Sequence, residues 1–318
     1  MDEAKNEQKN LDILYQILPH IAKFTVLAKF DKAFAFQDHP NPITTCGLKV
    51  YSQNDEDGIT LEILRRIGLS KGVFAEFGVG QGLENNTLSL AAMGWSGIWV
   101  GGEDLVFDVN PNQAKALNFH FQKAWVKRSN IVDLHRSGLA NIGQSRCDLI
   151  SLDLDGNDYY FVQELLRSGI SPEVFIVEYN AKFPPPIRFN VDYDDNFAWA
   201  GDDYFGASLQ VFFDLFKSHG YFLACCNVTG VNAFFVKNKH RAHFRDISDD
   251  INLLYASPKY FLTGLDIYRR PLSGKTIESI FRNLNSSQSR DAASISPVRR
   301  RIAVLADRLL QSMLKTRS

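Results

Sequence analysis

Between residues 73 and 179, short apolar runs alternate with segments of helical character, and this alternation narrows the possible folds more than any other feature. Runs such as "VFIV" at 174–177 lack the polar alternation of a strand that faces water on one side. We therefore expect strands that are covered on both faces. Strands separated by helical segments form parallel sheets with crossover helices. The sequence predicts an α/β fold with a mostly parallel sheet.

The apolar runs, and the glycines that end helices, place the individual elements. Strands are expected at 73–78, 97–100, 123–126, 148–153 and 173–179, and helices at 84–94, 130–137, 158–169 and 206–220. After the last of these helices, "YFLACCN" and "VNAFFVKN" flank a Thr-Gly turn. Two such runs joined by a turn indicate an antiparallel hairpin. The parallel sheet is thus predicted to finish in an antiparallel hairpin.

Four regions are expected along the chain. A helical N-terminal extension occupies 1–50, the sheet domain 51–240, a C-terminal extension 241–285, and a polar linker with a basic amphipathic helix 286–318. From 290 to 318 there are seven Lys or Arg residues against two Asp residues. A basic amphipathic helix can dock on a partner, join two copies of the chain or lie on a membrane surface, and these alternatives stay open.

Composition argues against several kinds of partner and several cellular locations. The 318-residue chain has a formal charge of −1, which argues against binding to a nucleic-acid backbone. Its apolar runs are too short to cross a bilayer, and the polar start "MDEAKNEQKN" is not a secretory signal. The four cysteines include no CxxC pair, which is typical of a reducing compartment. We expect a cytoplasmic protein with no transmembrane segment and no nucleic-acid partner.

A glycine-rich turn, "FAEFGVGQG", follows the first predicted strand. Gly78, Gly80 and Gly82 let the backbone turn sharply and approach a ligand closely. Glu76 precedes them, and a carboxylate there disfavours a pyrophosphate but suits the sulfonium amino acid of S-adenosylmethionine (SAM). A purely structural turn is the alternative. The second cofactor contact is expected just past the next strand, where Glu103 lies close to the position of a ribose-binding acid.

Three carboxylates crowd the end of another predicted strand, in "ISLDLDGNDYY" at 150–160. Such crowding is costly unless a cation, a proton or hydrogen-bond donors relieve it. Asp158 is interpreted as a cap of the helix that begins there. Asp153 and Asp155 are interpreted as active-site acids, and one of them, with a raised pKa, could act as a general base. A hard divalent ion with oxygen ligands is the alternative.

Together, "YSQNDEDGI", "FAEFGVGQGLENNT", "ISLDLDGND" and "GASLQVFFDLFKSHGYFL…VNAFFV" resemble the FkbM-type SAM-dependent methyltransferases over about residues 51–237. The resemblance implies a seven-stranded class I methyltransferase-like (Rossmann-like) sheet, SAM as cofactor and O-methylation of sugar or natural-product hydroxyls. It also implies cofactor contacts by the polar segments around the glycine turn. The cofactor-binding residues are then Gln53, Asp57, Glu76, Gly78, Gly80, Gly82, Asn86, Glu103 and Asp153, with Asp55 and Glu56 near the methionine end.

A looser similarity links the chain to the catechol and caffeoyl-CoA O-methyltransferases, which hold a divalent cation at the ends of two neighbouring strands. The corresponding residues here are Asp153, Glu178 and Asn180, the last two in "VEYNA". Because parallel strands end on one edge of a sheet, these side chains are expected to converge. The similarity implies a metal site, possible for Mg²⁺, and adds Asn180 to Asp153 and Asp155 as a catalytic residue.

The segment 181–204 has no period and interleaves aromatic with acidic residues. Aromatic faces beside hydrogen-bond acceptors suit a polyhydroxylated ring, so the predicted acceptor is a sugar, a glycan or a glycosylated small molecule. Packing of the aromatics onto the sheet is the structural alternative. Two other functions stay open: a NAD-dependent sugar-modifying enzyme, which would usually need a Tyr-x-x-x-Lys pair, and a non-catalytic binding or assembly module. SAM-dependent O-methylation is the favoured hypothesis.

Overall fold

The computed structural model describes residues 41–109 and 118–259. The predicted helix of the N-terminal extension, the polar linker and the basic C-terminal helix lie outside these residues. Of the predicted extensions, the structure therefore describes only 41–50 and 241–259. Among the described residues, no helix combines the length and the apolar character needed to cross a membrane.

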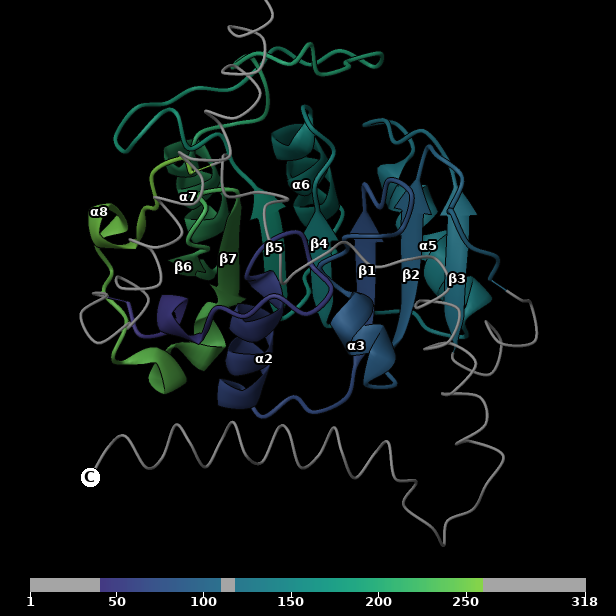
Figure 1. Cartoon of the computed structure of the whole chain (residues 1–318), viewed down its shortest axis with the longest axis horizontal. Coiled ribbons are helices and arrows are strands. Elements are labelled where there is room, and N and C mark those ends of the chain that lie inside the picture. The colour runs from purple at the N-terminus through teal and green to yellow at the C-terminus, as the bar shows by residue number, and fades with distance from the viewer. Residues whose placement is uncertain (1–40, 110–117, 260–318) are drawn as a thin grey trace, which may run out of the picture.

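The described residues build one seven-stranded sheet in the order β3-β2-β1-β4-β5-β7-β6 (Figure 1). Strands β1 to β5 run parallel, whereas β7 lies antiparallel between β5 and β6. This confirms the predicted α/β class, with a class I methyltransferase-like sheet and a terminal hairpin. The strands are β1 (Val73–Phe77), β2 (Ser96–Gly101), β3 (Phe119–Lys123), β4 (Leu149–Leu152), β5 (Val174–Glu178), β6 (Tyr221–Cys226) and β7 (Asn232–Lys237).

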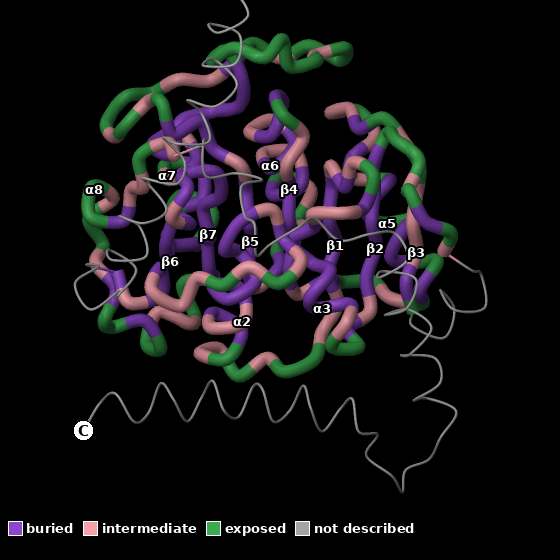
Figure 2. Tube along the Cα trace, viewed as in Figure 1, coloured by how far each residue is buried: buried purple, intermediate pink, exposed green. Residues whose placement is uncertain are grey.

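Helices cover both faces of the sheet. In Figure 1, α2 and α3 lie in front of the strands, whereas α5, α6 and α7 lie behind them. All the strands except the edge strand β3 are buried along nearly their whole length, and exposed residues gather in the connections (Figure 2). The helices are α2 (Glu56–Arg66), α3 (Leu88–Ala92), α5 (Ile131–Asn141), α6 (Asp158–Arg167), α7 (Leu209–Ser218) and α8 (Ile251–Leu254), with 3-10 turns η1 (Thr44–Cys46) and η2 (Asn238–Phe244).

Two predicted elements differ from the structure. The strand expected at 123–126 is β3 at 119–123, because Phe119 is buried edge-on against Trp99, with ring centroids 5.1 Å apart. The helix expected at 84–94 is reduced to α3, since Asn86 and Thr87 give their backbone N–H groups to Glu76 instead of entering the helix. Burial of Phe119 therefore sets the position of β3, and the buried carboxylate of Glu76 shortens α3, against the local sequence preference in each case.

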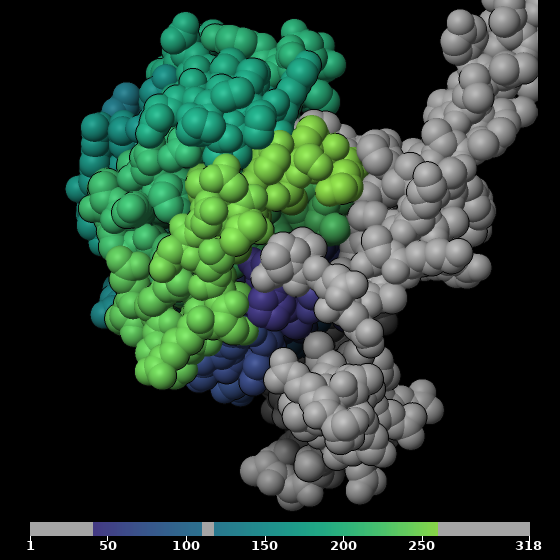
Figure 3. Space-filling view, turned by 90° about the vertical axis from the view of Figure 1, so that its left-hand side faces the viewer, coloured from purple at the N-terminus to yellow at the C-terminus, as the bar shows by residue number. Residues whose placement is uncertain are grey.

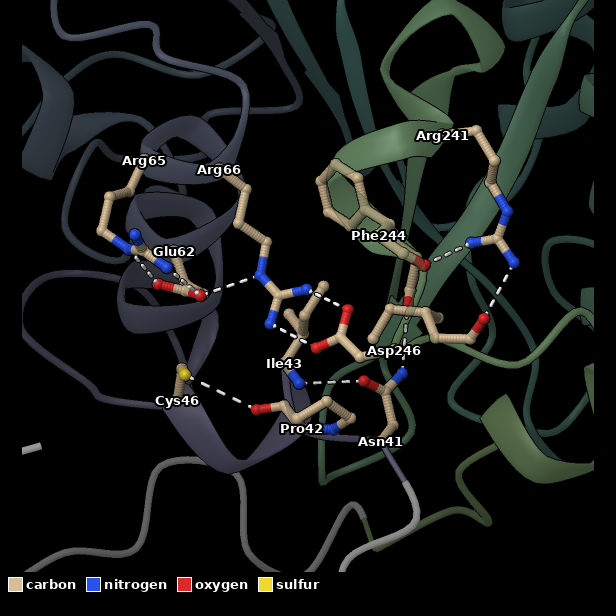
Figure 4. Close-up of polar contacts among 12 residues, drawn as sticks. Asn41, Pro42, Ile43, Cys46, Glu62, Arg65, Arg66, Arg241, Phe244 and Asp246 are labelled. Carbon is tan, nitrogen blue, oxygen red and sulfur yellow. Dashed lines mark hydrogen bonds and ion pairs between the residues drawn. The ribbon is translucent and has the colours of Figure 1, made fainter. Parts of the chain in front are cut away.

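Helix α2 is fastened to the hairpin side of the molecule by charged side chains (Figure 4). Arg66 donates to Glu62 on its own helix at 2.8 Å and to Asp246, beyond η2, at 2.6 Å and 2.9 Å. Asn41 donates to the carbonyl of Ala224 on β6 at 2.8 Å. In Figure 3 the segment after β7 runs over this side of the molecule beside the first described residues. These contacts connect the C-terminal end of α2 to the segment after η2, and the residues before η1 to β6.

Candidate active site

The glycine turn lies directly against the end of β4. Gly78 has φ +88°, and a Cβ built there would come within 1.6 Å of the carbonyl oxygen of Asp153. Glycine is therefore required for the backbones of the β1 turn and the β4 end to touch. Gly80, with φ +48°, has no heavy atom within 4 Å of its would-be Cβ. The turn thus leaves open space beside Gly80 for a ligand to approach the backbone.

Glu76, predicted to bind the cofactor, is engaged by the start of α3. Its carboxylate accepts hydrogen bonds from Asn86 N at 2.8 Å, from Thr87 N at 3.2 Å and from the Thr87 hydroxyl at 2.5 Å. Burial raises the pKa of Glu76 to about 7, against the effect of these hydrogen bonds. The Asn86 side chain donates to the hydroxyl of Ser151 on β4 at 3.1 Å. In the structure both residues hold the glycine turn in place, and direct cofactor contacts by them stay predictions.

Three carboxylates converge where β4 and β5 end. Asp153, Asp155 and Glu178 each offer an oxygen, and these oxygens all lie within 4.8 Å of one another. The convergence follows from the register, because Leu152 pairs with Val177 and the next residue of each strand is an acid. Oxygens this close form a geometry that a hard cation or a shared proton would stabilise.

Asp153 and Glu178 are electrostatically linked. Burial raises the pKa of Asp153 well above its usual range, and the neighbouring charges of Asp155 and Asp158 raise it further. Burial likewise raises the pKa of Glu178, followed by the charge of Asp153. The two side chains are within hydrogen-bonding reach of each other. Two acids in this situation hold one proton between them at a pH where isolated carboxyls have lost theirs.

Asp158 organises the turn before α6. Its carboxylate accepts hydrogen bonds from Leu154 N at 2.8 Å and from Gly156 N at 2.9 Å, and burial raises its pKa to about 6. The predicted capping of the helix is therefore replaced by bonds to the turn ahead of it. Asp155 sits in that turn with φ +56°, a left-handed conformation that Asp tolerates better than most residues. The turn in this way directs the Asp155 side chain toward the cluster.

The Asn180 side chain is bonded to the segment that follows β5. Its Nδ2 donates to the carbonyls of Asp203 at 2.9 Å and Phe205 at 3.0 Å, and its Oδ1 accepts from Lys182 N at 3.1 Å. The structure brings Asp155 to Asp153 and Glu178, and the catalytic and metal-binding roles of Asn180 stay predictions. Asn180 connects the returning part of the 181–204 segment to the end of β5.

The segment before α2 separates into residues with different surroundings. The carboxylate of Asp57 accepts bonds from the backbone N–H groups of Val50, Tyr51 and Ser52 at 2.7–2.8 Å. Asp57 therefore shapes the loop that precedes the helix. Gln53 is half-buried in that loop, and its carbonyl accepts from Lys49. Their direct contact with a cofactor stays a prediction.

The predicted ribose-binding acid, Glu103, is exposed just past the end of β2. The neighbouring acid, Asp104, is paired with Lys123 at 2.6 Å. Glu103 lies at the same edge of the sheet as the glycine turn, because β2 runs parallel to β1 and beside it. The position is compatible with the predicted contact.

Sequence reasoning missed two asparagines of the hairpin, Asn227 and Asn232. Their side-chain amides donate to Glu56 Oε1 at 2.7 Å and 3.0 Å, and all three residues are buried. Both asparagines flank the predicted Thr-Gly turn, where asparagine is common for conformational reasons alone. Nothing in the local sequence separates a turn asparagine from one that holds a buried acid.

The 181–204 segment passes over the acid cluster. A Cβ added to Gly156 would come within 2.2 Å of the Phe197 ring, so glycine is needed for that ring to seat on the turn beside Asp155. Asn157 donates to the carbonyl of Asp194 at 2.7 Å. Trp199 and Tyr204 remain about half exposed, at 51% and 47%. The segment thus brings exposed aromatic faces to the same edge of the sheet.

Comparisons with known proteins give a weak likeness to a solved structure. The chain matches no protein-family model and no curated protein. Among solved structures it is similar to an O-methyltransferase family 2 protein from Planctomyces limnophilus, determined in complex with apigenin, with 12% identity and a TM-score of 0.31. The likeness covers 69% of this chain and 61% of that one. The fold assignment rests on the strand order described above.

The linked acids predict how stability changes with pH. In the folded protein Asp153, Glu178 and Glu76 keep protons at pH values where the unfolded chain, with carboxyl pKa values near about 4, has lost them. The free energy of unfolding should therefore fall as pH rises from about 5 to about 8. Glu62 and Glu173, whose pKa values are lowered, change charge below this window. Burial lowers the pKa of His135 to about 4, so this group opposes the fall up to about pH 6.5, and the net fall should be steepest above that pH.

Urea unfolding at several pH values would measure this slope, and Glu178→Gln should make it shallower because one linked carboxyl is gone. Stability that rises across the same window would contradict the assignment of raised pKa values.

Proposed function

We propose that this protein is a SAM-dependent O-methyltransferase that methylates a hydroxyl of a sugar, a glycan or a glycosylated small molecule. The observation that carries the proposal is the contact between the β1 glycine turn and the end of β4. Gly78 touches Asp153, so a donor held on the turn would have its reactive end beside the acid pair. The motifs shared with the FkbM-type methyltransferases support the same assignment.

The residues of this chain fit the cofactor. The open space at Gly80 lets a ligand approach the backbone without meeting a side chain. The nearby acids Asp153, Asp155 and Glu178 favour a positively charged ligand over the pyrophosphate of NAD. When bound, SAM supplies the electrophilic methyl group. The chain would then orient the acceptor oxygen in line with that group, and such positioning provides much of the rate.

Asp153 is the proposed general base. Its raised pKa brings it closer to the working pH, where a carboxylate can accept a proton from an acceptor hydroxyl. Glu178 holds the second position of the pair and can take up or share that proton. The hydroxyl proton would go to the carboxylate, while the oxygen gains the methyl group and the methyl–sulfur bond breaks, which leaves S-adenosylhomocysteine as the neutral product.

A divalent ion is the alternative use of the same oxygens. Asp153, Asp155 and Glu178 would be its ligands, and the ion would lower the pKa of a bound acceptor hydroxyl. Turnover after treatment with EDTA distinguishes the two. Activity that survives chelation supports the proton-accepting pair, and activity restored only by added Mg²⁺ supports the metal.

Calorimetric titration of the full chain with SAM, S-adenosylhomocysteine and NAD tests the proposed function. Binding of the first two and not of NAD is expected. Binding of NAD alone would favour a NAD-dependent sugar-modifying enzyme, and binding of none would favour a non-catalytic module. The acceptor can then be sought by offering sugars and cell-lysate fractions with a radiolabelled methyl donor.

The aromatic segment predicts where the acceptor binds. Trp199→Ala should raise KM for a sugar acceptor by about 10-fold, because an exposed aromatic face contributes roughly 1 kcal/mol or more to such a contact. Affinity for S-adenosylhomocysteine should stay unchanged. Trp95→Phe serves as a control for general effects on the fold, because Trp95 is buried and lies just before the start of β2, at the opposite edge of the sheet. An unchanged KM in Trp199→Ala would remove the segment from acceptor recognition.

A further inference from the structure

An apolar cavity of about 310 Å³ lies between the C-terminal end of α2 and the end of α3, the two helices in front of the sheet in Figure 1. We call this cavity the α2–α3 groove. It borders the residues that precede β1 and β2, whereas the glycine turn and the acid cluster follow the opposite ends of the strands. The groove is therefore separate from the candidate active site. Its apolar wall consists of Leu61, Leu64, Leu69, Met93 and Trp95.

The wall of the groove combines buried and exposed apolar side chains. Leu64 and Trp95 are 3% and 2% exposed, whereas Met93 is 47% exposed. An exposed apolar side chain that continues into an apolar hollow indicates a contact site more strongly than an isolated one does. Methionine is also flexible enough to adapt to an irregular partner surface. A groove of this kind suits the apolar face of an amphipathic helix.

Positive charge borders the groove. Arg65 lines it with a side chain that is 58% exposed. Arg65 shares its partner, because Glu62 binds both Arg65 at 2.7 Å and Arg66 at 2.8 Å. Lys71, which follows the lining residue Ser70, is also exposed. An acidic occupant therefore suits this groove better than a basic one.

The chain carries a segment of this chemistry ahead of its first described residue. Leu11, Leu14 and Leu18 recur at the i, i+3, i+7 spacing of one helical face. Residues 1–12 contain four acids against two lysines. The other amphipathic segment, at 290–318, has seven Lys or Arg residues against two Asp residues. Charge thus favours the N-terminal segment as the occupant.

The length of the chain allows this segment to reach the groove. The described residues begin at Asn41 and soon pack on α2, where Gly58 N donates to the carbonyl of Leu48 at 3.0 Å. A Cβ added to Gly58 would come within 2.1 Å of the carbonyl oxygen of Cys46, so the two backbones touch. Helix α2 has 11 residues and is about 16 Å long. The linking residues 19–40 could span up to roughly 70 Å, which is ample to pass along this helix.

We propose that residues 11–18 dock as a helix in the α2–α3 groove of their own chain. Leu11, Leu14 and Leu18 would lie against the apolar wall, and the acids of residues 1–12 would lie near Arg65. Docking removes the exposed apolar surface around Met93 from water. The N-terminal extension then completes the front layer of the sheet domain. The inference does not depend on the proposed function, because the groove and the acid cluster lie at opposite edges of the sheet.

Hydrogen-exchange mass spectrometry on the full chain tests the docking. The amides of residues 11–18 should exchange more slowly than those of an unstructured peptide. Met93→Asp removes an apolar contact and adds a charge of the same sign as the segment, so it should speed their exchange by about 10-fold. Leu253→Asp, on α8 with a side chain 50% exposed, is the matched control and should leave their exchange unchanged. The amides of β1 and β4 should stay equally protected in all three proteins and so report on the fold.

A disulfide identifies the partner of the groove. Leu14→Cys and Met93→Cys are combined in a chain with Cys46→Ser, because Cys46 is half-buried while the other three native cysteines are buried. Oxidation at low protein concentration should link the two new cysteines within one chain, as mapped by mass spectrometry of the monomer. The pair Leu14→Cys and Leu253→Cys should stay reduced.

Four results would overturn the inference. The first is exchange of residues 11–18 at the rate of an unstructured peptide in the unaltered protein. The second is equal exchange of these residues in the unaltered protein and in Met93→Asp. The third is a disulfide that joins two chains, which would make a second copy the occupant. The fourth is faster exchange of 290–318 in Met93→Asp, which would assign the groove to the basic segment.

Discussion

Asp153→Asn is expected to lower turnover by about 100- to 10,000-fold, the range for loss of a general base. The substitution keeps the size of the side chain and removes only its ability to accept a proton. Because the backbone contact with Gly78 uses the carbonyl of Asp153, the glycine turn should keep its shape. Affinity for S-adenosylhomocysteine should therefore change little, and kcat should carry the loss.

Asp133→Asn, on the exposed first turn of α5, is the matched control and should be as active as the unaltered protein. Turnover would be measured with the radiolabelled methyl donor and affinity by calorimetry. Normal turnover in Asp153→Asn would exclude Asp153 as the base. A loss of donor affinity equal to the loss of turnover would make it a binding residue.

If a metal ion occupies the acid cluster, Asp153→Asn should respond differently to added Mg²⁺. Asn can still offer a neutral oxygen to a cation, so a metal-dependent enzyme should recover part of its activity at high Mg²⁺ concentration. If Asp153 instead acts as a general base, added Mg²⁺ should not restore the activity of Asp153→Asn, because the amide cannot accept the proton. The dependence of turnover on Mg²⁺ in Asp153→Asn and in the unaltered protein thus distinguishes the two uses of the acid cluster.

The sheet was predictable wherever a strand is apolar along its length. β1, β2, β4 and β5 lie inside the protein, and their runs of Val, Ile, Leu and Phe follow from burial on both faces. β3 was displaced in the prediction because "FHFQK" mixes apolar and polar residues, as a strand at the edge of a sheet can. Its place is set by the packing of Phe119 on Trp99, a contact between residues distant in sequence.

Only those residues of the candidate site whose positions follow from the strand order could be predicted from the sequence. Parallel strands that end on one edge bring Asp153 and Glu178 together, and that rule needs no side-chain detail. The place of Asn180 depends on where the 181–204 segment returns, and no local pattern encodes the carbonyls of residues 203 and 205 that its amide meets. The roles of Asn227 and Asn232 could not be predicted for the same reason, because their partner, Glu56, is more than 170 residues away in the sequence.

Gly78→Ala should destabilise the fold by at least about 4 kcal/mol, among the largest effects of a single substitution. Two costs add. A left-handed backbone costs Ala roughly 1–2 kcal/mol, and the new Cβ would lie 1.6 Å from the carbonyl oxygen of Asp153, which is backbone and cannot rotate away. Either the glycine turn or the end of β4 must move.

Gly68→Ala separates these two costs. Gly68 has φ +72° and no heavy atom within 4 Å of its would-be Cβ, so alanine there carries the backbone strain alone. Urea unfolding should find a small loss for Gly68→Ala and a much larger one for Gly78→Ala. Equal losses would mean that the β1 turn and β4 do not touch as described. Since that contact places the glycine turn beside the acid pair, equal losses would also remove the structural basis of the proposed chemistry.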